Sequence, residues 1–192
     1  MIKVFYDLET TGTDWRKHSI HQIAGCVEVD DVVVEWFDIK TQPHPKARIE
    51  PEALNVCHVT LDQIAGYQPM GDAYKQLIDM LSKYINKFDN KDKAYLVGFN
   101  NRGFDDFFLR KWFEHNQDQF IGSWFWNNTL DVLVLATEYL VDRRIDMPSF
   151  KLKRVAKTVG LYVDEGRLHD ALYDIELTRS VYRIVTGRDI GI

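Results

Sequence analysis

Residues 2–12 have the sequence IKVFYDLETTG, in which a short apolar run ends in two carboxylates, two threonines and a glycine. The run Ile2–Tyr6 predicts a buried strand. Asp7 and Glu9 are two residues apart, so their side chains share one face if the strand continues. Two carboxylates on one face repel each other unless a cation lies between them, and Gly12 lets the backbone approach a ligand closely. Taken alone, the stretch is also typical of a solvated strand end.

The rest of the chain alternates strand and helix patterns, which predicts an α/β or α+β domain with a central mixed sheet. Two β-rich segments, Ile20–Val29 and Val32–Ile39, are joined by Asp30 and Asp31, a pattern that predicts a tight hairpin. The remaining predictions are a loop with three prolines over 41–51, short helical turns at Pro51–Val56 and Leu61–Ala65, a helix over Asp72–Phe88, a strand over Ala94–Phe99, a helix over Phe104–Phe113, an apolar segment Thr129–Tyr139 of either type, a helix capped by Ser149 and running to Val159, and a last helix over Asp170–Thr186.

Two later segments contain acids at the start of predicted helices. Residues 98–109, GFNNRGFDDFFL, place Asp105 after a strand and a polar loop, where an aspartate is also an ordinary helix cap. Residues 169–174 are HDALYD. On one continuous helix His169 and Asp174 would lie about 140° apart, so they converge only if His169 precedes the helix. Taken alone, each segment is compatible with solvated surface residues.

Together, the three segments resemble the motifs of the DnaQ-like exonuclease family, in its branch with four acids and a histidine, within the RNase H-like superfamily. Residues 7–12 match Asp-x-Glu-Thr-Thr-Gly, residues 100–109 match Asn-x-x-x-Phe-Asp-x-x-Phe-Leu, and residues 169–174 match His-x-Ala-x-x-Asp. The second match selects Asp105 rather than Asp106. The resemblance extends from Ile2 to about Val185. It departs from the family at Phe99, often a histidine, and at Thr13, often an apolar residue beside the terminal base.

The resemblance implies an α/β, RNase H-like exonuclease fold, with a central mixed five-stranded sheet flanked by helices and one 3′→5′ exonuclease domain over residues 1–192. It implies hydrolysis of terminal phosphodiester bonds with release of nucleoside 5′-monophosphates. Two Mg²⁺ or Mn²⁺ would be bound by Asp7, Glu9, Asp105 and Asp174, and His169 would accept a proton from the attacking water. The residues expected to contact the terminal nucleotide are Thr10, Thr11, Gly12, Asn100 and Phe104.

The composition indicates the type of protein and its compartment, and it says little about the activity. The 192 residues, 45% hydrophobic and 28% charged, suit one globular domain, and no apolar run reaches the length of a membrane span. The carboxylate of Asp7 comes too early in the chain for the apolar stretch of a signal peptide. The chain has two cysteines, Cys26 and Cys57, which predicts a reducing, cytoplasmic compartment. Each of them is expected to have an ordinary structural role. The net charge of −5 neither supports nor excludes a nucleic-acid partner.

Several alternatives stay open at this point. The expected partner is nucleic acid with a free 3′ end, with single-stranded DNA favoured over RNA, and an RNA-trimming exoribonuclease is the main alternative. An inactive nucleic-acid-binding module and a small-molecule phosphoesterase are the others, and a homodimer or a polymerase or replication partner is left open. Two further segments are either nucleic-acid contacts or ordinary surface and core: the basic residues Lys151, Lys153, Arg154 and Lys157, and the aromatic run Trp124–Trp126.

Overall fold

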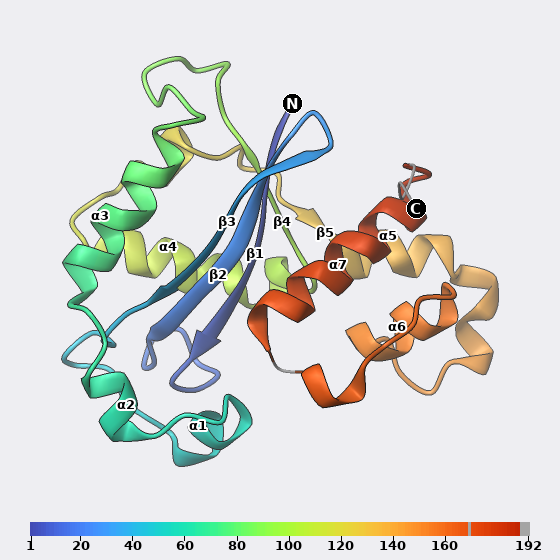
Figure 1. Cartoon of the computed structure of the whole chain (residues 1–192), viewed down its shortest axis with the longest axis horizontal. Coiled ribbons are helices and arrows are strands. Elements are labelled where there is room, and N and C mark those ends of the chain that lie inside the picture. Colours follow the sequence, from blue (N-terminus) through green and yellow to red (C-terminus); the bar gives the residue numbers. More distant parts are fainter. Residues whose placement is uncertain (169, 189–192) are drawn as a thin grey trace.

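A computed structural model describes residues 1–168 and 170–188, which are built around a mixed sheet with the strand order β3-β2-β1-β4-β5 (Figure 1). The central strand β1 is antiparallel to β2 and parallel to β4. At the edges of the sheet, β3 pairs with β2 in the antiparallel direction, and β5 pairs with β4 in the parallel direction. This confirms the predicted mixed sheet of five strands. The strands are β1 (Ile2–Thr10), β2 (Ile20–Val29), β3 (Val32–Lys40), β4 (Tyr95–Gly98) and β5 (Leu130–Asp131).

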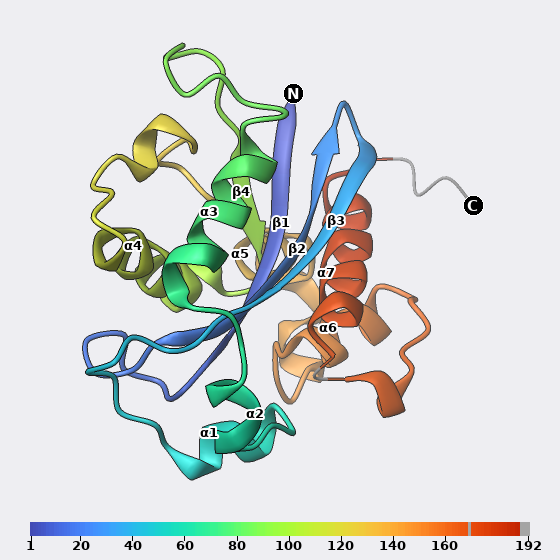
Figure 2. The same cartoon turned by 60° about the vertical axis from the view of Figure 1, so that its left-hand side comes forward.

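Helices cover both faces of the sheet (Figures 1 and 2). One face packs against α3 and α4, and the other packs against α5, α6 and α7. None of the helices in the described ranges combines the length and the apolarity needed to cross a bilayer. The covering helices are α3 (Met70–Leu81), α4 (Asp105–His115), α5 (Val132–Tyr139), α6 (Leu152–Thr158) and α7 (Ala171–Val185).

The alternation of side chains along β1 divides the core into two layers. Tyr6 and Leu8 are buried in the layer that includes α3 and α4, whereas Phe5 is buried in the layer that includes α7. Because successive side chains of a strand point to opposite faces, Asp7 and Glu9 continue the face of Phe5. The two acids therefore lie at the end of a strand whose apolar residues are anchored in both layers.

The hairpin between β2 and β3 forms where the sequence predicts it. Asp30 and Asp31 connect the strands and have φ angles of 48° and 68°. Two successive left-handed residues are what a tight hairpin of this kind requires, and aspartate tolerates that conformation better than most residues. The turn therefore brings two acidic side chains to the start of β1, which is paired with β2 at Val29.

Two short helices, α1 (Pro51–Val56) and α2 (Leu61–Ala65), have the predicted bounds and lie beyond the end of β1 (Figures 1 and 2). The segment before α1 is bonded to the loop that follows β1. The amide of Glu50 donates to the carbonyl of Thr11 at 2.8 Å, and the hydroxyl of Thr11 donates to the carbonyl of Arg48 at 2.7 Å. This pairing holds α1 beside the last residues of the strand.

Several helix boundaries differ from the prediction, most clearly at the end of α3 and at the start of α6. Helix α3 ends at Leu81 rather than Phe88, whose side chain is 87% exposed and has no core to cover. Helix α6 begins at Leu152, because Lys151 has extended backbone angles, so Ser149 is not its N-cap. The ambiguous segment 129–139 contains both element types, with β5 directly followed by α5. Fraying and capping at helix ends depend on contacts that hydrophobic periodicity does not report.

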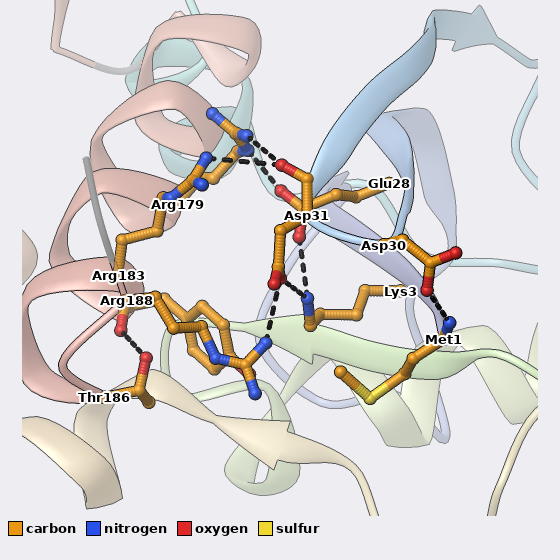
Figure 3. A network of polar contacts seen from close by, with 10 residues as sticks. Met1, Lys3, Glu28, Asp30, Asp31, Arg179, Arg183, Thr186 and Arg188 are labelled. Carbon is orange, nitrogen blue, oxygen red and sulfur yellow. Dashed lines mark hydrogen bonds and ion pairs between the residues drawn. The ribbon is translucent and has the colours of Figure 1, made fainter. Parts of the chain in front are cut away.

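A network of charged side chains joins β1 and β2 to α7 at the far end of β1 from the two acids (Figure 3). Lys3 is fully buried and donates to Glu28 at 2.7 Å, and the other oxygen of Glu28 accepts from Arg179 of α7 at 2.6 Å. Asp31 also accepts from Lys3, and this hydrogen bond is the main reason that the pKa of Asp31 is lowered to about 2. Glu28 therefore links the strand of the first motif to the helix of the third.

Candidate active site

Asp7 and Glu9 lie at the end of β1 with their side chains partly exposed, and they alternate with the buried Tyr6 and Leu8. Regular pairing with β2 is interrupted by a register shift directly after Glu9. Both residues belong to the paired part of the strand, and because they are two positions apart, their side chains project from the same face. The prediction that the two carboxylates share a face of the strand is confirmed.

The structure brings the predicted carboxylates of three elements together. Burial raises the pKa of Asp7 well above its usual value, and the negative charges of Asp105, Glu9 and Asp174 raise it further. Burial is also the main cause of the raised pKa of Asp105, to which the charges of Asp106 and Glu9 add. Charges influence each other's pKa mainly at short range, so the ends of β1, α4 and α7 lie near one another.

The two neighbouring acids of α4 have different surroundings. The two oxygens of Asp106 accept from the hydroxyl of Tyr6 at 2.5 Å and from the hydroxyl of Thr129 at 2.9 Å. Asp105 is 6% exposed and acts electrostatically on Asp7. Asp106 therefore connects α4 to the sheet through its hydrogen bonds. Asp105 is the acid of this helix that belongs to the group of carboxylates around Asp7, in agreement with the selection of Asp105 from the motif.

The chemistry of this group fits a hard divalent cation. Within residues 1–168 and 170–188, no three His, Cys, Asp or Glu side chains form a ready-made metal-binding group. The fit is electrostatic: both burial and mutual repulsion disfavour the ionised forms of Asp7 and Asp105. A cation among them would offset this cost, and carboxylate oxygens are the ligands that Mg²⁺ and Mn²⁺ prefer.

The loop after β1 is folded by its own backbone bonds. Thr11 is fully buried, its amide donates to the carbonyl of Ser19 at 2.9 Å, and its carbonyl accepts from Glu50. The hydroxyl of Thr10 donates to the carbonyl of Gly12 at 2.9 Å. These bonds give Thr11 a role in folding the loop. Contact of Thr10, Thr11 and Gly12 with a nucleotide stays a prediction.

Gly12 is explained by packing inside the loop. A Cβ atom at this position would lie 2.6 Å from the ring of His18, which is too close for any other residue. The His18 ring is held in place because its Nδ1 accepts from the amide of Asp14 at 3.0 Å and its Nε2 lies 3.1 Å from a carboxylate oxygen of Glu50. The sequence predicted that a ligand approaches the backbone at Gly12 closely. In the structure, the His18 side chain of the same loop makes this close approach.

Asn100 and Phe104 lie on either side of the turn that precedes α4. Asn100 has a left-handed φ of 65°, and its amide donates to Asp131 at 3.0 Å, as does the amide of Arg102 at 3.3 Å. Asp131 thus holds this turn against β5, a role that the sequence did not reveal. The ring of Phe104 lies 4.9 Å from that of Phe108 and packs against the core, so at least part of its role is structural.

The third motif is described only in part. Helix α7 begins at Ala171, and its N-cap Asp170 accepts from the amide of Tyr173 at 3.0 Å. Asp174 lies in the first turns of this helix and contributes to the raised pKa of Asp7. His169 lies outside the described residues, and its position beside an attacking water stays a prediction.

Cys57 contacts the carboxylate group, which the sequence interpretation missed. Its Sγ donates to Oε2 of Glu9 at 2.8 Å. Burial, this hydrogen bond and the charges of Glu9 and Asp7 raise the pKa of the thiol. The two residues are 48 positions apart, so no spacing rule connects them. In the sequence, Cys57 is marked only by its place directly after the short helical turn Pro51–Val56.

The other segments considered for nucleic-acid contact have local partners. Lys153 and Lys157 both pair with Glu165, at 2.8 Å and 2.6 Å, which partly neutralises the basic patch. Trp124 and Phe125 are 2% and 4% exposed and belong to the core, so core packing is confirmed for them. A cavity of about 560 Å³ between β3 and α3 is not lined by any of the candidate residues.

Comparisons with known proteins agree with this geometry. A family model described as "Exonuclease" matches residues 4–182. The fold matches Escherichia coli Exonuclease I in complex with a dT13 oligonucleotide, with a TM-score of 0.76 and 23% identity over 97% of this chain and 41% of that one. The zinc-bound form of that enzyme's complex with single-stranded DNA matches with a TM-score of 0.76 and 22% identity over 97% of this chain and 40% of that one. The chain thus has the RNase H-like exonuclease fold and spans about two fifths of the length of these structures.

Proposed function

The chain belongs to the exonuclease family, and from this premise we propose that it is a metal-dependent 3′→5′ exonuclease that removes nucleoside 5′-monophosphates from single-stranded DNA. The observation that carries the proposal is the mutual electrostatic influence of Asp7, Glu9, Asp105 and Asp174, which come from three different elements. Such a group is costly to bury unless cations are bound there. The preference for DNA is supported by the similar structures, which are complexes with dT13 and dA16 oligonucleotides.

The proposed mechanism assigns one task to each group. Asp7, Glu9, Asp105 and Asp174 would together hold two Mg²⁺ or Mn²⁺, since the charges of the other three acids all act on Asp7. When bound, the cations supply activation of a water and stabilisation of the departing 3′-alkoxide. His169 accepts the proton as the water oxygen bonds to phosphorus and the bond from phosphorus to the 3′ oxygen breaks. An imidazole does this near neutral pH in its uncharged form.

End-labelled oligonucleotides test the activity and its direction. With Mg²⁺ or Mn²⁺, single-stranded DNA labelled at its 5′ end is expected to give a ladder that shortens from the 3′ end, with mononucleotides released. Excess chelator should abolish the ladder, because the carboxylates cannot activate water by themselves. A 3′-phosphate should slow the reaction. Internal first cuts, degradation from the 5′ end or undiminished rates in chelator would contradict the proposal.

The same assay with RNA of the same sequence and with a blunt duplex defines the substrate. We expect single-stranded DNA to have the highest kcat/KM, since an unpaired end must enter the site. A much higher kcat/KM on RNA would make the chain an exoribonuclease. Hydrolysis of a generic phosphodiester without attack on either polymer would make it a small-molecule phosphoesterase.

Replacing His169 by alanine separates catalysis from metal binding. General-base assistance is typically worth about 10²–10⁴-fold in rate, so kcat should fall by that factor while Mn²⁺ binding and thermal stability stay near the wild type. Asp174→Ala is the matched comparison, because it removes a proposed ligand and should weaken both Mn²⁺ binding and turnover. Calorimetric Mn²⁺ titration beside the rate assay decides the matter. Equal loss of Mn²⁺ binding in both variants would make His169 a ligand or a structural support.

A further inference from the structure

We propose that Cys57 is a positioning residue for Glu9, whose carboxylate it holds in the orientation that binds a divalent cation. The inference rests on the proposed function, because it concerns the metal-binding form of the same site. Cys57 donates to one oxygen of Glu9, Oε2, at 2.8 Å. Fixing one oxygen of the carboxylate fixes the orientation of the whole group, and with it the way in which the group meets a cation.

The position of the thiol is set by the segment that carries it. Cys57 is the residue directly after α1, and its amide donates to the carbonyl of Ala53 at 3.2 Å. Leu54 of the same helix is 5% exposed and anchors α1, and the amide of Val59 donates to its carbonyl at 3.1 Å. The turn that presents Sγ is therefore bonded on both sides of Cys57.

A second attachment joins this segment to the strand of Glu9. The amide of Glu50, the residue before α1, donates to the carbonyl of Thr11 at 2.8 Å. Thr11 is two residues beyond Glu9 in the chain. The backbone bond at Thr11 and the side-chain bond at Glu9 thus connect the same two segments. The backbone bond keeps these segments side by side, so the position of the thiol relative to the carboxylate does not depend on their own hydrogen bond alone.

The expected benefit is pre-organisation of a flexible ligand. Glutamate loses substantial rotamer freedom when its side chain is fixed, and a partner that fixes it before the cation arrives lowers that cost at the binding step. Groups that orient a metal ligand in this way typically change metal affinity by about 10–100-fold when they are removed. A thiol is a weak donor, so the lower end of this range applies, and serine, a stronger donor, should replace it.

The test uses the full chain with Cys57→Ala, Cys57→Val and Cys57→Ser, and Cys26→Ala as the matched control. Cys26 is a buried thiol in the core layer that includes α7, whereas Cys57 is only partly buried. Mn²⁺ affinity is measured by calorimetry without substrate, and thermal unfolding is measured without metal. The exonuclease assay then gives the Mn²⁺ concentration for half-maximal rate and the kcat at saturating Mn²⁺.

We expect the alanine and valine variants to bind Mn²⁺ about tenfold more weakly and to recover most of kcat at saturating Mn²⁺, with the serine variant close to the wild type. Cys26→Ala should change the melting temperature without changing Mn²⁺ affinity. Mn²⁺ affinities equal to the wild type in the alanine and valine variants, or a serine variant as weak as alanine, would overturn the inference. If the wild type itself binds no Mn²⁺ and degrades no oligonucleotide, the proposed function fails first and the inference fails with it.

Discussion

Replacing Asp7 by asparagine is expected to lower the kcat of the proposed exonuclease by at least about 10³-fold, equivalent to roughly 4 kcal/mol of activation free energy. The charges of Glu9, Asp105 and Asp174 all act on this one carboxylate, so its loss should affect the proposed cation site most. An amide has nearly the same shape but no charge, and only its one oxygen can act as a ligand. The rate on 5′-labelled single-stranded DNA and the Mn²⁺ affinity by calorimetry measure the effect.

The same substitution should stabilise the metal-free protein. Because the folded state raises the pKa of Asp7, it binds that proton more tightly than the unfolded chain does. Its contribution to the free energy of unfolding is therefore favourable below about pH 4, the usual pKa of aspartate, and is lost as the pH rises through the raised value. Asparagine removes this penalty at neutral pH. We expect a higher melting temperature than the wild type without metal, and no further rise on adding Mg²⁺.

Asp106→Asn is the matched control, since it changes an acid that is bonded to Tyr6 and Thr129. Hydrogen bonds to charged groups are worth about 1.5–3 kcal/mol each, so this variant should lose stability. It should keep Mn²⁺ affinity and most of its activity. An Asp7→Asn variant with kcat within tenfold of the wild type would show that the catalytic carboxylates have been misassigned.

Replacing Glu28 by alanine is expected to lower the free energy of unfolding by about 3–5 kcal/mol, the usual cost of removing one partner of a buried ion pair. Lys3 is fully buried, and Glu28 is 1% exposed between it and Arg179. Without Glu28, the ammonium group of Lys3 would keep the carboxylate of Asp31, whose side chain is 43% exposed, and the face of the Tyr182 ring. Urea denaturation followed by circular dichroism measures the loss.

An exposed pair at the same end of the sheet provides the control. Asp30 pairs with the N-terminal amine, and both groups are largely exposed. Asp30→Asn, which removes the charge and keeps a residue that tolerates the left-handed turn, should change the free energy of unfolding by about 1 kcal/mol at most, because exposed pairs are screened by solvent. A double variant, Lys3→Met with Glu28→Leu, should recover much of the loss, since neither charge is then left unpaired. A Glu28→Ala variant no less stable than Asp30→Asn would show that the network does not hold α7 to the sheet.

Local patterns in the sequence were sufficient for the framework of the fold. The period-two pattern of β1 placed Asp7 and Glu9 on one face, and the Asp30–Asp31 turn between two β-rich segments predicted the hairpin. These features depend on neighbours a few residues away, and backbone geometry determines them almost independently of the rest of the chain. Where an element's end depended on distant contacts, as at Phe88 and Ser149, the prediction was wrong.

The sequence by itself determined the residue types of the site, because three short motifs with fixed internal spacing name the four acids and His169. Only the tertiary structure decided which side chains hold those acids in place. The contact of Cys57 with Glu9 and the link through Glu28 from Lys3 to Arg179 join residues that are 48, 25 and 151 positions apart. Such contacts form when the packing of both core layers brings separate elements together, and a contact made by packing leaves no periodicity in the sequence.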